Sequence, residues 1–182
     1  CGVAAMGDVL VYLGIHQISC NTDLLYGIVR EDGLLSYPRY ERYLRKIRHR
    51  YLGIIPGLGV LNLGLCRALN KYFRHYRIEL RARWCLSSRK MLGRIQNSLS
   101  RDYPVILAIG QNIPFWRRKK LTLYRQENGN YFPATETKAH YVTVTGMENV
   151  YLQIASWGKE YFISWEEYLE YARKYSSFLV SN

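Results

Sequence analysis

The sequence has little of what marks a protein as something other than an ordinary globular chain. Its 182 residues include only four cysteines and five prolines, and no two cysteines form a C-x-x-C pair. No apolar run approaches the roughly 20 residues that cross a bilayer, and the amino end shows no secretory signal. These absences exclude a disulfide-dense scaffold and predict no transmembrane segment within the sequence.

Motifs for metals, cofactors and nucleic acids are also missing. His16 and Cys20 are four residues apart, but nothing near them completes a zinc set. There is no glycine-rich phosphate loop and no aromatic–basic RNA-binding motif. We therefore expect no metal, no cofactor and no nucleic-acid partner.

Acidic residues are scarce. The 14 aspartates and glutamates face 26 lysines and arginines, which gives a formal net charge of +12. The basic residues gather at 39–50 and 117–120 and are scattered between 67 and 94. Such a charge favours anionic partners, and on charge alone a nucleic-acid binder stays open, but a solvated basic surface without a partner has the same composition.

The first half of the chain has helical periodicity. Apolar residues recur at helical spacing near the start, after Pro38, after Leu61 and after Ser87. The segment 78–84 alternates instead, which predicts a half-buried strand. The helical part is expected to cover about residues 1–100.

The second half is typical of an antiparallel sheet. The apolar run 105–110 predicts a central strand, Asn128-Gly129 predicts a hairpin, and three further short strands follow. Ser164 and Glu167 form a capping box for a last helix. The sequence thus predicts a single α+β domain over 1–182, with its sheet at about 101–182.

Cys1 and His140 are the residues best suited to chemistry. Cys1 stands at the start of a predicted helix, where the helix dipole and free N–H groups stabilise a thiolate. His140 stands at the entrance to a predicted strand, where its ring can be held rigidly at a cleft. A cysteine on an early helix and a histidine 139 residues later follow the chain order of papain-like enzymes.

Three short motifs carry a family resemblance. CGVAAM resembles the start of the catalytic helix in bacterial bacteriocin-processing (double-glycine leader) peptidases, and AHYVTVTGM resembles their histidine strand. IASWG resembles the Asn-Ser-Trp-Gly stretch of papain. The resemblance implies a papain-like two-lobed fold and a thiol protease acting on a peptide or protein substrate. It makes Cys1 the nucleophile, His140 the general base that forms an ion pair with it, and Gly146 a structural residue.

Two departures from the family pattern bear on catalysis. Ala155 occupies the position of the orienting asparagine, and the adjacent Ser156 is expected to reach the site only if a bulge turns it. The glutamine that supplies an oxyanion-hole donor would lie upstream of Cys1, so we expect the sequence to be truncated there. Gln17 and Gln111 are the glutamines within the sequence that could supply this oxyanion-hole donor instead.

Other interpretations stay open at this stage. A papain-like binding or scaffold domain without turnover fits the missing orienting residue. If Cys1 is a true terminus, two further classes stay open: an N-terminal-nucleophile hydrolase, and a lipoprotein acylated at this cysteine. Phe115, Trp116 and Tyr131 can line a cleft for an aromatic or acidic substrate segment, or pack a surface hairpin.

Overall fold

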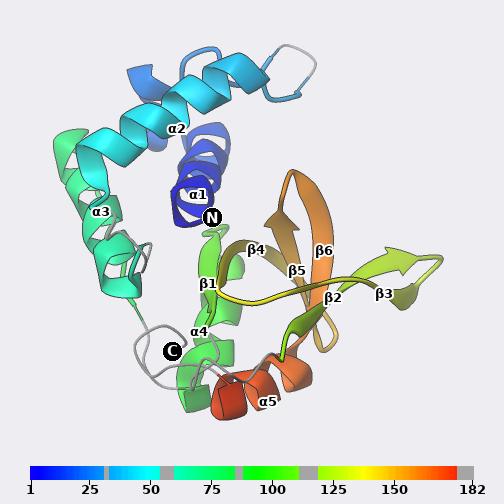
Figure 1. Ribbon diagram of the computed structural model, residues 1–182. Helices are drawn as coiled ribbons and strands as arrows, with labels where there is room; N and C mark the ends of the chain where they lie inside the picture. Colours follow the sequence, from blue (N-terminus) through cyan, green and yellow to red (C-terminus); the bar gives the residue numbers. More distant parts are fainter. Residues whose placement is uncertain (31–32, 54–59, 85–87, 111–118, 176–182) are drawn as a thin grey trace. The chain divides into compact units, whose positions relative to one another are not determined.

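The computed structural model describes residues 1–30, 33–53, 60–84, 88–110 and 119–175. The chain forms two compact units, which are described separately: Gly2–Trp84, and Cys85–Asn182 together with Cys1. The architecture is α+β, with helices first and a six-stranded antiparallel open sheet after them (Figure 1). The expected α+β class is confirmed, whereas the single-domain organisation stays a prediction.

The first unit is helical. It contains α1 (Gly2–His16), two short 3₁₀ helices at Ile18–Cys20 and Asp23–Leu25, α2 (Tyr37–Tyr51) and α3 (Asn62–His75). The apolar stripe of α2 is buried at Tyr43, Ile47 and Tyr51, while its basic residues stay exposed, as their spacing predicts.

The strand expected at 78–84 is wrong. The described backbone there has no regular structure, and it lies along α3 instead of in a sheet. The side chain of Asn70 accepts a hydrogen bond from the Ala82 N–H and donates one to the Ala82 carbonyl, both at 2.9 Å. One side chain thus satisfies both backbone groups of Ala82 without a neighbouring strand.

The second unit is a sheet with helices packed on it. Its elements are α4 (Ser88–Leu99), β1 (Val105–Ile109), β2 (Leu121–Glu127), β3 (Asn130–Thr137), β4 (His140–Glu148), β5 (Tyr151–Ser156), β6 (Lys159–Ser164) and α5 (Trp165–Tyr175). The strand order is β1-β4-β5-β6-β2-β3, and every neighbouring pair is antiparallel. The predicted meander is therefore β4-β5-β6, with earlier strands added on both sides.

The position predicted for β1 is wrong, because this strand lies at an edge of the sheet and pairs only with β4 among the described strands. Its apolar sequence has another cause. Leu107 and Ile109 are buried in the core that α4 and α5 form on one face of the sheet, and Tyr168 of α5 donates a hydrogen bond to the Ala108 carbonyl. Helix packing, rather than a second neighbouring strand, explains the apolar run.

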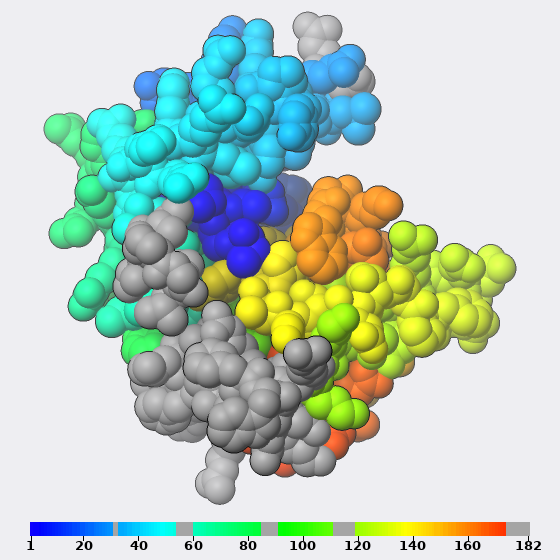
Figure 2. All heavy atoms as spheres, viewed as in Figure 1, coloured from blue at the N-terminus to red at the C-terminus, as the bar shows by residue number. Residues whose placement is uncertain are grey.

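The hairpin and the last helix follow their sequence signals. Asn128 and Gly129 adopt φ values of 52° and 78°, which suit the two-residue turn between β2 and β3. This hairpin projects beyond the neighbouring strands (Figure 2). At α5, the Glu167 N–H donates to Ser164 Oγ at 3.5 Å, but the Glu167 carboxylate accepts from Tyr124 instead of completing the box.

Candidate functional site

His140 begins β4 and is held from both sides. Its cross-strand partner is the fully buried Ile109 of β1. The preceding Ala139 has a left-handed backbone (φ 52°), and its N–H donates to the Gly110 carbonyl at 3.2 Å. An alanine in this conformation costs about 1–2 kcal/mol. The connection from β3 thus turns sharply into β4, and this turn fixes the backbone position of His140.

Ser156 is the polar partner of this imidazole. His140 Nε2 and Ser156 Oγ lie 2.8 Å apart, and the serine is only 5% exposed. The register explains the contact, because Ile154 pairs with Val144 and residues two apart on a strand share a face. Ser156 therefore lies on the same face of the sheet as His140. The sequence signal that would have predicted this is the alternation of β5, in which Ser156 follows the apolar Ile154 by two residues.

The expectation that Ser156 needs a bulge to reach the site is wrong. The register shift between β4 and β5 falls between Val144 and Gly146, away from Ser156. Ala155 pairs with Thr143 and so faces the other side of the sheet. The residue at the position of the family's asparagine is thus directed away from His140, and its neighbour makes the contact.

Trp157 covers the imidazole. The two rings are stacked, with centroids 4.5 Å apart and an interplanar angle of 18°. Trp157 and Gly158 form the β5–β6 turn with φ values of 50° and 69°, which is what brings the indole back over β4. The outer part of the indole is exposed to solvent, at 56%.

The environment keeps the imidazole uncharged. Burial is the main cause that lowers the pKa of His140 from its ordinary value to about 4. At neutral pH this histidine is a neutral base. The arrangement can accept a proton, but it does not supply a resting imidazolium.

Cys1 lies beside the same turn. Its side chain is exposed, and its thiol points to the carbonyl of Ala139, with Sγ and O 4.0 Å apart. That distance is the long limit for a weak thiol hydrogen bond. Cys1 groups with the sheet unit and not with the helices that follow it in sequence. The structure thus brings Cys1, His140 and Ser156 into one neighbourhood.

The other two described thiols differ from Cys1. Cys20 donates to the Gln17 side chain, and Cys66 donates to the Ala82 carbonyl at 3.3 Å. Burial raises the pKa of both thiols. They are therefore held in the thiol form, which makes them internal references for the reactivity of Cys1.

The remaining expected positions divide into three groups. Gln17 accepts a hydrogen bond from Cys20, and it belongs to the helical unit. Gln111, Phe115 and Trp116 lie outside the described residues, as do Cys85 and Ser87. Tyr131 is stacked on Tyr151, and its pairing with Gln126 places it on the face opposite Arg125.

Gly146 has a packing role that fits its expected structural function. A Cβ at this position would come within van der Waals overlap of the Gln153 side chain on β5. Glycine therefore allows Gln153 to lie across β4 just beyond the register shift, where it reaches Glu160.

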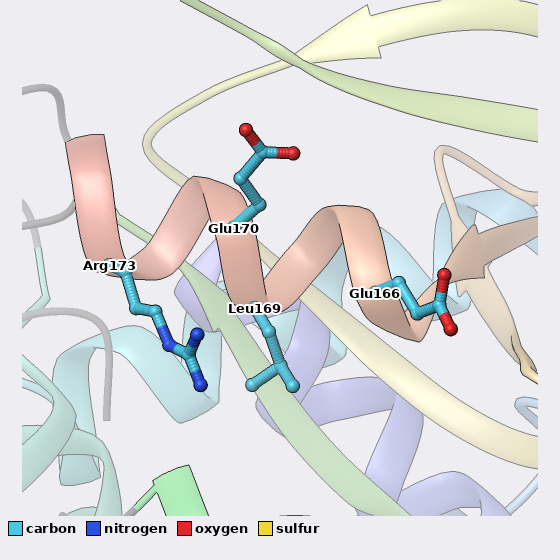
Figure 3. A pocket seen from close by; sticks show the side chains of 4 residues that line it. All are labelled: Glu166, Leu169, Glu170 and Arg173. Atoms are coloured by element: carbon cyan, nitrogen blue, oxygen red, sulfur yellow. The ribbon is translucent and has the colours of Figure 1, made fainter.

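One surface hollow of about 310 Å³ lies on α5 and is lined by Glu166, Leu169, Glu170 and Arg173. These side chains leave a single helix in different directions, and none is a predicted site residue (Figure 3). Within the described part of the chain, no three histidine, cysteine or acidic side chains gather as metal ligands. No described helix is long and apolar enough to cross a membrane.

Comparisons with protein-family models, with curated proteins and with solved structures found no match to this chain.

Proposed function

We propose that the protein is a cysteine-dependent hydrolase that cleaves a peptide or amide bond. In this proposal it has the papain-like two-lobed fold and is closest to bacteriocin-processing peptidases, as its three motifs suggest. The observation that carries the proposal is the 2.8 Å contact of His140 Nε2 with Ser156 Oγ, together with the Cys1 thiol 4.0 Å from the carbonyl oxygen of the preceding residue, Ala139. Because Ser156 engages Nε2, Nδ1 is the ring nitrogen left to exchange a proton with the thiol.

The roles follow from the protonation states. The neutral His140 takes the proton of the Cys1 thiol as the sulfur attacks the substrate carbonyl carbon, which forms a tetrahedral oxyanion. The imidazolium then gives this proton to the leaving amine as the C–N bond breaks, and a thioester remains. Water attacks the thioester with the same histidine as base, which releases the acid and restores the thiol. Ser156 orients the ring during both transfers.

This mechanism differs from the ion pair that the family resemblance implies. A histidine with a pKa near 4 is not protonated in the resting site at neutral pH. His140 then removes the proton of the thiol only as the sulfur attacks an electrophile, whether a substrate carbonyl or an alkylating agent, through general-base catalysis worth about 10²- to 10⁴-fold in rate. A chain acting in this way reacts more slowly with free alkylating agents than an enzyme with a preformed thiolate.

The test is residue-resolved alkylation. Native protein is treated with iodoacetamide at pH 7, and the labelling rate of each cysteine is followed by peptide mass spectrometry. We expect Cys1 to react fastest and its rate to fall about tenfold or more in His140→Ala. His49→Ala, which removes an exposed histidine on α2, is the matched control and should leave the rate unchanged. A Cys1 rate indifferent to His140 contradicts the proposal.

A binding or scaffold domain is the second candidate. The lowered pKa of His140 favours it, because an uncharged ring offers no resting stabilisation to a thiolate. In that case, Cys1 would alkylate at the rate of a free exposed thiol in the wild type and in His140→Ala alike. The same experiment therefore separates the two candidates.

A further inference from the structure

The face of the sheet that carries His140 continues as a row of cationic and aromatic side chains. Lys159 is the cross-strand partner of Ser156 and is exposed. Two residues further on β6, Tyr161 shares that face, and the Arg125 guanidinium of β2 lies over its ring, 5.9 Å from the centroid. On β3 the row ends with Phe132, the partner of Arg125, which is 50% exposed.

The row is continuous because successive strands carry it. Trp157 touches His140 on one side and meets the Tyr161 ring edge-on at 6.2 Å on the other. The β5–β6 turn, the start of β4 and the hairpin adjoin on the visible surface, in orange, yellow and yellow-green (Figure 2). Three strand spacings of about 4.8 Å lie between the strands of Ser156 and Phe132. The row therefore extends roughly 14 Å across the sheet, which matches about four residues of extended peptide.

The charges on the row point to the chemistry of its ligand. Among the described residues, neither Lys159 nor Arg125 forms an ion pair. On the described part of β2, Glu127 shares this face by the hairpin turn, while Glu160 of β6 points to the other face and accepts a hydrogen bond from Gln153. Lys159, next to His140, therefore has no acidic side chain opposite it on β5, whereas Arg125 has Glu127 two residues further along β2.

A peptide fits this row better than a nucleic acid. Two cations neutralise far fewer phosphates than the six to ten contacts of a typical nucleic-acid site. The aromatic surface available for stacking bases is also limited to Phe132 and the outer part of Trp157, because His140 covers one face of Trp157, and Tyr161 is buried beneath Arg125. One or two carboxylates beside an apolar side chain match what the row presents.

We propose that the substrates of this hydrolase carry acidic side chains within about four residues of the cleaved bond, held by Lys159 and Arg125, with an apolar side chain against Phe132. This inference rests on the proposed function for the cleavage itself. The peptide recognition is a separate property of β6 and the hairpin, and it can be measured without turnover.

The test uses the full chain with Cys1→Ala, so that binding does not depend on reactivity. Fluorescein-labelled hexapeptides that differ only in carrying two glutamates, two glutamines or two lysines are titrated by fluorescence anisotropy. We expect the glutamate peptide to bind about tenfold more tightly than the glutamine peptide, with the preference weakening as salt rises. Equal affinity for the three peptides, or no binding, overturns the inference.

Charge-reversal variants locate the effect. Lys159→Glu and Arg125→Glu should each remove most of the preference for glutamate, about threefold to tenfold. Arg101→Glu makes the same change in net charge at an exposed position after α4 and should leave the preference intact. If Arg101→Glu acts like the other two, the preference reflects net charge alone and the inference fails.

The two proposals fail in different ways. Loss of the dependence of Cys1 alkylation on His140 removes the hydrolase but leaves any peptide preference standing. Equal binding of the three peptides removes the substrate assignment but leaves the alkylation result untouched. A third result would also overturn the inference. If Lys159→Glu and Arg125→Glu weaken binding of a single-stranded oligonucleotide but leave the peptide affinities unchanged, the row binds nucleic acid.

Discussion

Ser156 and His140 meet across two strands that are consecutive in the chain, on one face of the sheet and next to its buried core. The contact depends on register and not on a special loop. A serine two residues after the buried Ile154 reaches the imidazole, whereas the alanine between them cannot. The same relationship decides how the site responds to substitution.

The first prediction concerns these two neighbours. Ser156→Ala should slow the alkylation of Cys1 by about threefold to tenfold, because one orienting hydrogen bond is lost. Ala155→Asn, which introduces the asparagine of the papain stretch that this segment resembles, should leave the rate within about twofold, because residue 155 faces away from His140. A rate gain in Ala155→Asn would show that the register in the active protein differs.

The second prediction concerns the titration of His140. Its pKa of about 4 lies below the ordinary value of 6.5, so the unfolded chain binds more protons between these pH values. This histidine therefore contributes stability that is fully present above pH 6.5 and is lost as the pH falls toward 4. NMR of the imidazole should show a midpoint near 4, and a midpoint near 6.5 would contradict the burial described here.

The third prediction concerns Trp157. An asparagine suits the left-handed backbone of this turn position better than tryptophan does, so Trp157→Asn removes the ring without disturbing the turn. Without the stacked indole, the pKa of His140 should rise toward 6.5, because burial is the main cause of its depression. NMR titration measures the change, and urea unfolding checks that the fold is kept. An unchanged midpoint would assign the burial to other groups.

The fourth prediction concerns two glycines of the sheet unit. Gly129→Ala should lower the free energy of unfolding by about 1–2 kcal/mol, because position 129 requires φ near 78°. Gly93→Ala is the matched control, because this position lies within α4 and an added Cβ meets nothing within 4 Å. Alanine there should raise the free energy of unfolding by up to about 1 kcal/mol. Denaturant titration measures the free energy of unfolding of both variants. A change of the same sign and size in Gly129→Ala and Gly93→Ala would contradict the turn geometry.

Local signals were sufficient for much of the fold. The helix through Tyr43 and Ile47 and the turn at Asn128-Gly129 form as their patterns predict, because each depends on spacing or on backbone conformation within a few residues. The segment around Ala82 was misassigned, because its alternation competes with a side chain 12 residues away, Asn70, that no local pattern reveals.

The candidate site was predictable only in part. The positions of Cys1 and His140 follow from motifs, but the role of Ser156 follows from cross-strand register, and register depends on which residues of β4 and β5 pair. The low pKa of His140 depends on burial and therefore on the complete fold. Lys159 and Arg125 were missed because β2 and β6 are far apart in sequence, and nothing short-range indicates that they pair.

The strand order has a consequence for how the protein is made. β1 and β2 precede the central strands β4, β5 and β6 in the chain, yet they pair with the outer members of that group. On a ribosome that has not yet released residues 140–164, the apolar β1 and one side of the hairpin have no partner to cover them. Newly made chains therefore pass through a stage with exposed strand edges, and the tendency to aggregate is highest until residues 140–164 are available to pair with them.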